Sequence, residues 1–305
     1  MNRCTRYVLV FALLFAGGSA ISAQDKPLRK LTGEPDEVIA YKTVELEDGK
    51  SNALNLHVFK PDGHQASDKA PCVVFFFGGG WNGGVPTQFF PQCEYLASRG
   101  MVAISAEYRT KKSHNVIPKV CVFDGKSAIR WVRDHAADLG IDPDRLAAGG
   151  GSAGGHVASA VAACKDLEAD DADTTTSCVP NALVLFNPVY DNGPEGYGYD
   201  RVKDYWQQMS PMHNIRKDMP PTIAFFGTED PLIPVATTKE FGKRMKAAGV
   251  RYDNHLYEGQ AHGFFNQGRS KGDTNYFVET VRTADKFLQS LGFLDGEATI
   301  DTFVK

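Results

Sequence analysis

Residues 149–156 read GGGSAGGH, which places five glycines around one serine and one alanine. Glycine costs conformational entropy to order, so such a cluster indicates a backbone that turns where a Cβ would clash, or that approaches another group closely. Within the stretch, residues 150–154 fit G-x-S-x-G. This pattern is typical of a strand that turns sharply into a helix and exposes a nucleophilic serine. The stretch therefore predicts a nucleophile at Ser152, provided that a strand precedes it and a helix follows it.

The apolar segments of the chain supply that setting. Strands are predicted at residues 38–46, 53–59, 72–77, 101–106, 145–148, 182–186, 222–226 and 252–257. Helices are predicted at residues 89–99, 116–139, 235–248 and 274–291, and a helix of small residues follows the glycine cluster. Alternating strands and helices indicate an α/β fold with a mostly parallel central sheet and helices on both faces. Residues 188–220, rich in Tyr and Gly, interrupt the alternation, and we expect a loop or partial lid there.

The composition is that of an ordinary globular protein. Of 305 residues, 42% are hydrophobic and 23% are charged, which suits one large α/β domain. The net charge of −4 leaves no polybasic footprint, so we expect no nucleic-acid partner. The cysteines lack the spacing of zinc ligands, and we expect no metal, no cofactor and no obligate protein partner.

The first 23 residues show the succession of positive, apolar and small residues that is typical of a secretory signal peptide. Arg3 and Arg6 precede an apolar run at residues 7–16, and small residues follow up to Ala23. The run is too short to span a bilayer, so no stable membrane anchor is expected. We predict cleavage after Ala23 or Ala20, a secreted or periplasmic location, and a single domain over residues 24–305.

Five cysteines remain after such a cleavage, and an oxidising compartment permits disulfides. The odd number leaves at least one thiol unpaired within the chain. Cys164 and Cys178 flank a polar, acidic loop that a disulfide between them could close. Cys72 and Cys121 lie in apolar surroundings and are expected to be buried thiols.

A nucleophilic serine requires a base, and the base requires a carboxylate that orients it. In this kind of fold the two partners follow the serine in chain order, each on a loop after a later strand. Asp230 follows the predicted strand 222–226, and His262 follows the predicted strand 252–257. The sequence therefore predicts a catalytic triad of Ser152, Asp230 and His262.

Four other ionisable residues compete for these roles. Glu229 neighbours Asp230 but is expected to be a solvent-exposed loop charge. His255 falls inside a predicted strand and His156 in a first helical turn, where structural roles are expected. Asp124 lies in a predicted helix, and we expect it to pair with Arg130 or Arg133 of the same helix.

Acyl transfer also requires hydrogen-bond donors for the developing oxyanion, in part from a loop after an earlier strand. Residues 77–81, FGGGW, directly follow the predicted strand 72–77. Glycines allow the amides of such a loop to face the site without side chains in the way. We therefore expect this loop to contribute to the oxyanion hole.

These motifs resemble the α/β-hydrolases of the esterase/lipase group related to hormone-sensitive lipase, and more closely the secreted bacterial carbohydrate esterases. The resemblance runs over residues 38–291 and rests on FGGGW 77–81, AEYR 106–109, DGKSAIRWVR 124–133, GGSAGG 150–155, Asp230 and GQAHGF 259–264. It implies that Ser152 is the nucleophile, His262 the base and Asp230 the orienting acid. It also implies oxyanion N–H groups from Gly79, Gly80 and Ala153.

Two departures from the family stand out. The family usually has His before the three glycines, where this chain has Phe77. A phenylalanine can anchor the loop only by packing, so we expect the oxyanion hole to persist with less tightly fixed geometry. The short segment before the first predicted strand leaves no room for a large cap domain. A more open site suits a bulky substrate.

Export, an open site and aromatic side chains together favour an ester of a polysaccharide. Trp81, Tyr190 and Trp206 are candidates to stack on sugar rings, although each could equally pack its loop against the body of the protein. The resemblance implies removal of O-acetyl groups from xylan or a similar glycan through an acyl-enzyme on Ser152.

Other functions are considered beside this one. Feruloyl esterase and general short-chain carboxylesterase are alternatives of the same class. A prolyl-oligopeptidase-type peptidase would carry a propeller domain, and the sequence has no repeat array. A non-catalytic binding module would typically have lost a member of the triad, and all three are present.

Overall fold

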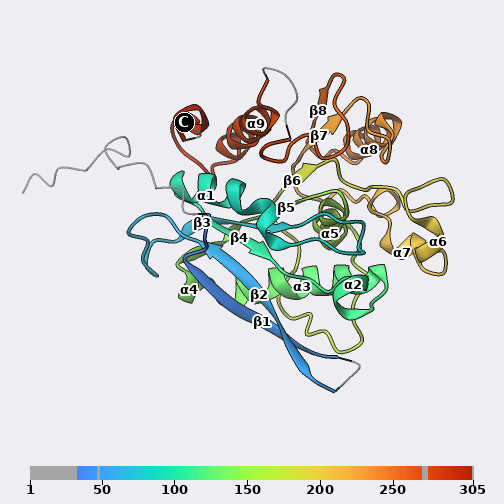
Figure 1. The fold of residues 1–305 in the computed structure, drawn as a ribbon, viewed down its shortest axis with the longest axis horizontal. Coiled ribbons are helices and arrows are strands. Elements are labelled where there is room, and N and C mark those ends of the chain that lie inside the picture. Colours follow the sequence, from blue (N-terminus) through green and yellow to red (C-terminus); the bar gives the residue numbers. More distant parts are fainter. Residues whose placement is uncertain (1–32, 47–48, 270–273, 304–305) are drawn as a thin grey trace, which may run out of the picture.

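The computed structural model describes residues 33–46, 49–269 and 274–303 (Figure 1). The predicted signal peptide, residues 1–23, lies outside these ranges. An eight-stranded sheet in the order β1-β2-β4-β3-β5-β6-β7-β8 forms the centre of the molecule. Within the described ranges, no helix combines the length and the apolarity needed to cross a bilayer.

The strands and helices alternate along most of the chain. The strands are β1 (Glu37–Glu45), β2 (Ser51–Phe59), β3 (Ala70–Phe76), β4 (Val102–Ala106), β5 (Ile141–Gly151), β6 (Ala182–Phe186), β7 (Thr222–Gly227) and β8 (Tyr252–Tyr257). The helices are η2 (Pro86–Phe89), α1 (Phe90–Ser98), α2 (Lys111–His114), α3 (Pro118–Asp134), α4 (Ala136–Leu139), α5 (Ala153–Ala163), α6 (Tyr199–Val202), α7 (Trp206–Met209), η3 (Pro211–His213), α8 (Val235–Ala247), α9 (Tyr276–Ser290) and α10 (Ile300–Phe303).

The strand pairing brings several loops to one edge of the sheet. β1 pairs with β2 and β2 with β4 in antiparallel fashion, and every other neighbouring pair is parallel. The carboxyl ends of parallel strands meet at the same edge, where open α/β sheets bind their ligands. The loops after β3, β5, β6, β7 and β8 therefore converge there.

Both faces of the sheet are covered by helices, as the sequence predicts (Figure 1). All seven residues of β3 are buried, and their side chains alternate between two hydrophobic cores. Val74 and Phe76 pack into the core that contains residues of α3, α5 and α8. Val73 and Phe75 pack into the core that contains residues of α1 and α9. The continuous apolar run at 72–77 is thus explained by burial on both sides.

Most predicted strands and helices agree with the structure to within two residues at each end, and three predicted segments differ by more. β5 begins at Ile141, earlier than predicted, because this residue pairs with Ala70 of β3 across an irregularity in the register. The predicted helix 116–139 is divided into α3 and α4 at His135, whose backbone (φ −100°, ψ 21°) leaves the helical region. Residues 188–220 contain the short helices α6, α7 and η3, which the sequence did not predict.

Asp124 is structural, as expected, but its partners are not those predicted. Its buried carboxylate accepts hydrogen bonds from Arg109 at 2.7 and 2.8 Å and from Lys42 at 3.0 Å. Arg130 instead pairs with Glu168. Residues three or four positions apart share a helix face, and Arg130 stands six positions from Asp124, so it points elsewhere.

The structure contains no disulfide between Cys164 and Cys178. All five cysteines of the described chain are buried free thiols. The Cys164 thiol points to the carbonyl of Met209 and the Cys178 thiol to the carbonyl of Val161, so the two sulfurs face different neighbours. Burial raises the pKa of Cys164 to about 12, which keeps it in the unreactive thiol form.

Candidate active site

Ser152 occupies the sharp turn between β5 and α5. Its φ of 54° and ψ of −118° are strained for a residue with a Cβ, and such strain is a frequent property of functional positions. The neighbouring glycines are required by space. A Cβ on Gly150 would lie 2.5 Å from the carbonyl oxygen of Phe76, and a Cβ on Gly154 would lie 2.0 Å from the same oxygen. The turn is pressed against the end of β3, which explains the glycine cluster.

The structure brings the three predicted triad residues together. His262 Nε2 lies 2.8 Å from Ser152 Oγ, and His262 Nδ1 lies 2.7 Å from Asp230 Oδ2. The side chain of Asp230 is fully buried, and its Oδ1 accepts the N–H groups of Leu232 at 2.8 Å and Ile233 at 3.0 Å. These bonds orient the carboxylate so that it accepts the proton on Nδ1. Nε2 is then free to accept the serine proton.

Asn187, which the sequence analysis missed, holds the loop of His262 in place. It follows β6 directly, is fully buried, and adopts a φ of 35°. Its Oδ1 accepts the N–H of Gly263 at 2.9 Å, and its Nδ2 lies 3.4 Å from His262 Nε2. Its place after a buried strand at the carboxyl edge is the signal that could have identified it.

The side chains of the competing ionisable residues make none of the hydrogen bonds that hold the triad together. Glu229 is exposed, and His255 lies in β8 with its ring near Phe225. His156 is fully buried and contacts Asn192 Oδ1 at 3.0 Å and the carbonyl of Met209. Burial lowers the pKa of His156 to about 4, so it is neutral at pH 7.

The glycine loop after β3 presents unused amides. Gly79 and Gly80 have φ values of 137° and 64°, and a Cβ on Gly79 would lie 2.2 Å from the carbonyl oxygen of Gly83. Across the described chain, the N–H groups of Gly79, Gly80 and Ala153 donate to no other protein group. Ala153 is the first residue of α5, whose N-terminus carries a partial positive charge. These amides can serve as oxyanion donors.

Phe77 is anchored by more than packing, which corrects the expectation from the sequence. Its ring stacks on that of Tyr108 with centroids 4.2 Å apart, and the Tyr108 hydroxyl donates to the carbonyl of Phe77 at 2.6 Å. One residue further, the N–H of Gly78 donates to the side chain of Gln88 at 2.6 Å. Gln88 in turn donates to Asn266. Hydrogen bonds from elsewhere in the chain therefore fix the loop in the absence of the usual histidine.

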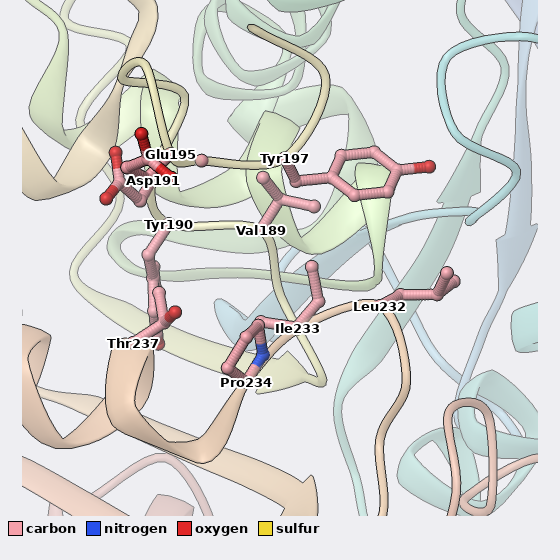
Figure 2. Close-up of a pocket in the computed structure, with 10 residues that line it drawn as sticks. Val189, Tyr190, Asp191, Glu195, Tyr197, Leu232, Ile233, Pro234 and Thr237 are labelled. Atoms are coloured by element: carbon pink, nitrogen blue, oxygen red, sulfur yellow. The ribbon is translucent and has the colours of Figure 1, made fainter.

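The triad opens into a cleft of about 600 Å³. Besides Ser152, His262 and the glycine loop, the cleft is lined by Asn82, Gln88, Asn187, Tyr197, Arg201, Leu232, Phe265, Asn266 and Arg269. A smaller pocket of about 200 Å³ adjoins it and shares Tyr197 and Leu232 (Figure 2). The segment between β6 and β7 thus forms a wall of the cleft. In the described part of the chain, no group of three or more His, Cys, Asp or Glu side chains is placed to hold a metal ion.

The aromatic residues predicted to contact substrate do not line the cleft. Trp81 is 2% exposed and lies beneath the guanidinium of Arg201. Tyr190 is fully buried, with its ring stacked on Phe241 at 3.7 Å. Trp206 is half-buried against His213 and is absent from the cleft lining. Each ring packs on other side chains, which buries its apolar faces: Tyr190 packs against α8, whereas Trp206 packs on His213 of its own segment between β6 and β7. Among the aromatic residues of the segment between β6 and β7, Tyr197 lines the cleft instead.

Comparisons with known proteins agree with this geometry. Two family models match the chain, BD-FAE at residues 56–189 and the dienelactone hydrolase family at residues 194–291. The apo form of Thermogutta terrifontis esterase 2 is 45% identical, with a TM-score of 0.80, over 88% of this chain and 98% of that chain. The chain belongs to the α/β-hydrolase esterase/lipase group. This hydrolase therefore has a known type of scaffold, and the described residues form no large cap domain.

Several further relatives are named as esterases. Esterase LipQ of Mycobacterium tuberculosis is 27% identical over 217 residues, which are 65% of this chain and 51% of that protein. This hydrolase spans about half the length of the curated relatives that it matches. A structure of Thermogutta terrifontis esterase 2 with butyrate bound is 44% identical with a TM-score of 0.79, over 89% of this chain and 100% of that chain. These relatives support the class of serine carboxylic ester hydrolases.

Proposed function

We propose that this protein is an exported serine esterase that removes short acyl groups, acetyl in particular, from a polysaccharide such as xylan. One observation carries the proposal: the hydrogen-bonded chain from Ser152 through His262 to Asp230 opens into a cleft beside three unused amides. The order of charge, apolar run and small residues at 1–23 supports export.

The proposed reaction proceeds in two steps. Ser152 Oγ attacks the ester carbonyl while its proton passes to His262 Nε2, and the negative charge on the carbonyl oxygen is stabilised by the amides of Gly79, Gly80 and Ala153. The alcohol leaves with the proton from His262, and an acyl-enzyme remains on Ser152. Water then gives its proton to His262 and attacks the acyl carbonyl, and the acid is released as serine regains its proton.

The polar lining of the cleft supports a hydrated alcohol such as a sugar. The exposed Asn82 and the half-buried Tyr197 line it with polar side chains, while the carboxamides of Gln88, Asn187 and Asn266 are bonded within the protein. A carboxamide such as that of Asn82 both donates to and accepts from hydroxyl groups, which matches the chemistry of a sugar ring. Solved structures of a related esterase with propionate or butyrate bound favour a second candidate, a general short-chain carboxylesterase.

The test uses purified protein, 4-nitrophenyl acetate and butyrate, and release of acetate from acetylated xylan. We expect turnover of all three, and a loss of at least about 10⁴-fold in Ser152→Ala. Ser159→Ala is the matched control: its hydroxyl bonds only to carbonyls within α5, so its activity should be preserved. Paraoxon should add mass to the peptide that contains Ser152.

The outcomes separate the candidates. Turnover of the nitrophenyl esters without acetate release from xylan would favour the general carboxylesterase. Hydrolysis of a peptide amide without ester hydrolysis would favour a peptidase, and no turnover at all would favour a binding module. Export is tested on the full chain by N-terminal sequencing, which should begin after Ala20 or Ala23.

A further inference from the structure

The charge of the catalytic cleft contrasts with that of the whole chain. The protein has a net charge of −4, yet the charged side chains that line the cleft, apart from the triad histidine, are the guanidinium groups of Arg201 and Arg269. Among the described residues, none that lines it carries a carboxylate. Asp230 lies fully buried behind His262, and its oxygens are occupied by His262 and two backbone amides.

Arg201 is held with its charge available. It extends from α6, its Nη1 donates to the carbonyl of Gly80 at 2.6 Å, and its guanidinium lies 4.9 Å from the ring of Trp81 and 5.4 Å from that of Tyr197. One of five N–H groups is thus used, and the aromatic faces attract the cation without neutralising it. In the described part of the chain it forms no ion pair.

Arg269 reaches the same cleft from a different loop. It follows His262 by seven positions, and its N–H donates to the carbonyl of Asn266, which closes a turn beside the site. Its side chain is exposed and, among the described residues, forms no ion pair with a carboxylate. Two guanidinium groups from separate segments, neither paired with a carboxylate of the described residues, therefore border the space in front of Ser152.

The adjoining pocket has the opposite charge. Asp191 and Glu195 line it, and Figure 2 shows them at one end, with the side chains of Tyr197 and Leu232 pointing away from them. Tyr197 and Leu232 also line the cleft, so the boundary between negative and positive surroundings runs along these two residues. A negatively charged substrate group is repelled on one side of this boundary and attracted on the other.

From this arrangement we propose that Arg201 and Arg269 select an ester that carries a carboxylate close to the bond cleaved. Guanidinium groups recognise carboxylates through paired, charge-assisted hydrogen bonds. The carboxylate can belong to the alcohol half, as in an acylated sugar acid, or to the acyl half, as in a half-ester of a dicarboxylic acid. This inference rests on the proposed hydrolysis at Ser152.

Matched pairs of esters test the inference by their kcat/KM ratios. The first pair is acetylated methyl glucuronide against acetylated methyl glucoside, and the second is monoethyl succinate against ethyl butyrate. We expect wild-type enzyme to favour the anionic member of at least one pair by about fivefold or more at low salt, and the preference to weaken in 0.5 M NaCl. The pair that responds identifies the half of the ester that bears the carboxylate.

The variants separate charge recognition from an effect on the glycine loop. Arg201→Gln removes a positive charge together with the bond to the carbonyl of Gly80, which the shorter glutamine does not reach, whereas Arg269→Gln removes a positive charge without touching that loop. Each should reduce the anionic-to-neutral ratio several-fold. Lys243→Gln is the matched control, because Lys243 is an exposed cation on α8, 81% accessible and outside the cleft, and its ratio should not change.

Two results would overturn the inference. If neutral and anionic esters are hydrolysed equally well, or if the ratio survives both arginine substitutions, the cleft does not select by charge, while ester hydrolysis itself stands. If none of these esters nor 4-nitrophenyl acetate is hydrolysed, the proposed function fails and the inference fails with it.

Discussion

Removing one hydroxyl group, in Tyr108→Phe, should loosen the oxyanion loop without touching the triad. In the structure this hydroxyl donates to the Phe77 carbonyl at 2.6 Å, in a place where both residues are buried. A buried acceptor left without its donor costs about 1–3 kcal/mol of unfolding free energy. Complete loss of one oxyanion donor costs about 10²–10³ in kcat. Because Gln88 still holds Gly78, we expect a partial effect of about tenfold in kcat, with little change in KM.

The assay combines urea unfolding with kcat and KM for 4-nitrophenyl acetate. Tyr41→Phe provides the control, since the Tyr41 hydroxyl also donates to a backbone carbonyl, that of Glu107, at 2.6 Å, but away from the site. Both variants should lose similar unfolding free energy, and only Tyr108→Phe should lose kcat. If the two variants keep kcat equally well, Tyr108 does not position the loop and the reasoning is wrong.

Four further predictions concern the triad, the sharp turn at Ser152, the buried His156 and the thiols. Asp230→Asn should lower kcat by about 10³–10⁴, whereas Glu229→Gln should stay within about twofold, as measured with 4-nitrophenyl acetate. Gly154→Ala should lower the unfolding free energy by about 3 kcal/mol or prevent folding, because its Cβ would lie 2.0 Å from a carbonyl oxygen. Gly249→Ala is the control: the space around it is open but its φ is 76°, so the unfolding free energy should fall by only about 1 kcal/mol in the same denaturation assay. Burial lowers the pKa of His156 to about 4, so the neutral ring contributes its full stability above the ordinary pKa near 6.5. This contribution is lost as the pH falls from 6.5 to 4, and the unfolding free energy should drop by about 3 kcal/mol over that window. His156→Gln should flatten this dependence of the unfolding free energy on pH. A thiol reagent should label none of the five described cysteines before unfolding and all of them afterwards, and a reductant should leave the Tm unchanged.

The sequence was sufficient for the fold and for the three reacting side chains. Buried parallel strands appear as continuous apolar runs, so the point at which each strand ends can be read from the chain. Ser152 and Asp230 follow such runs, whereas His262 follows the partly exposed edge strand β8, and the parallel topology of the sheet brings the three together. The glycines beside Ser152 carry an equally local signal, because only close backbone contacts explain them.

The remaining parts of the site depend on contacts between distant segments. Phe77 and Tyr108 stand 31 positions apart, and Gly80 and Arg201 stand 121 apart, so no local pattern reveals either pair. Burial is equally invisible to a local pattern. Trp81 and Tyr190 are residue types that often stack on sugars, but in the structure Arg201 covers the ring of Trp81 and Phe241 covers the ring of Tyr190.

The reacting side chains and one wall of the cleft lie on different parts of this chain. The reacting atoms are fixed by turns at the ends of β5, β7 and β8, inside a sheet that packing makes rigid. Arg201 and Tyr197, by contrast, belong to a segment of short helices between β6 and β7 that contributes no reacting atom. Substitutions in this segment can therefore change which esters enter the cleft while the triad beneath it stays intact.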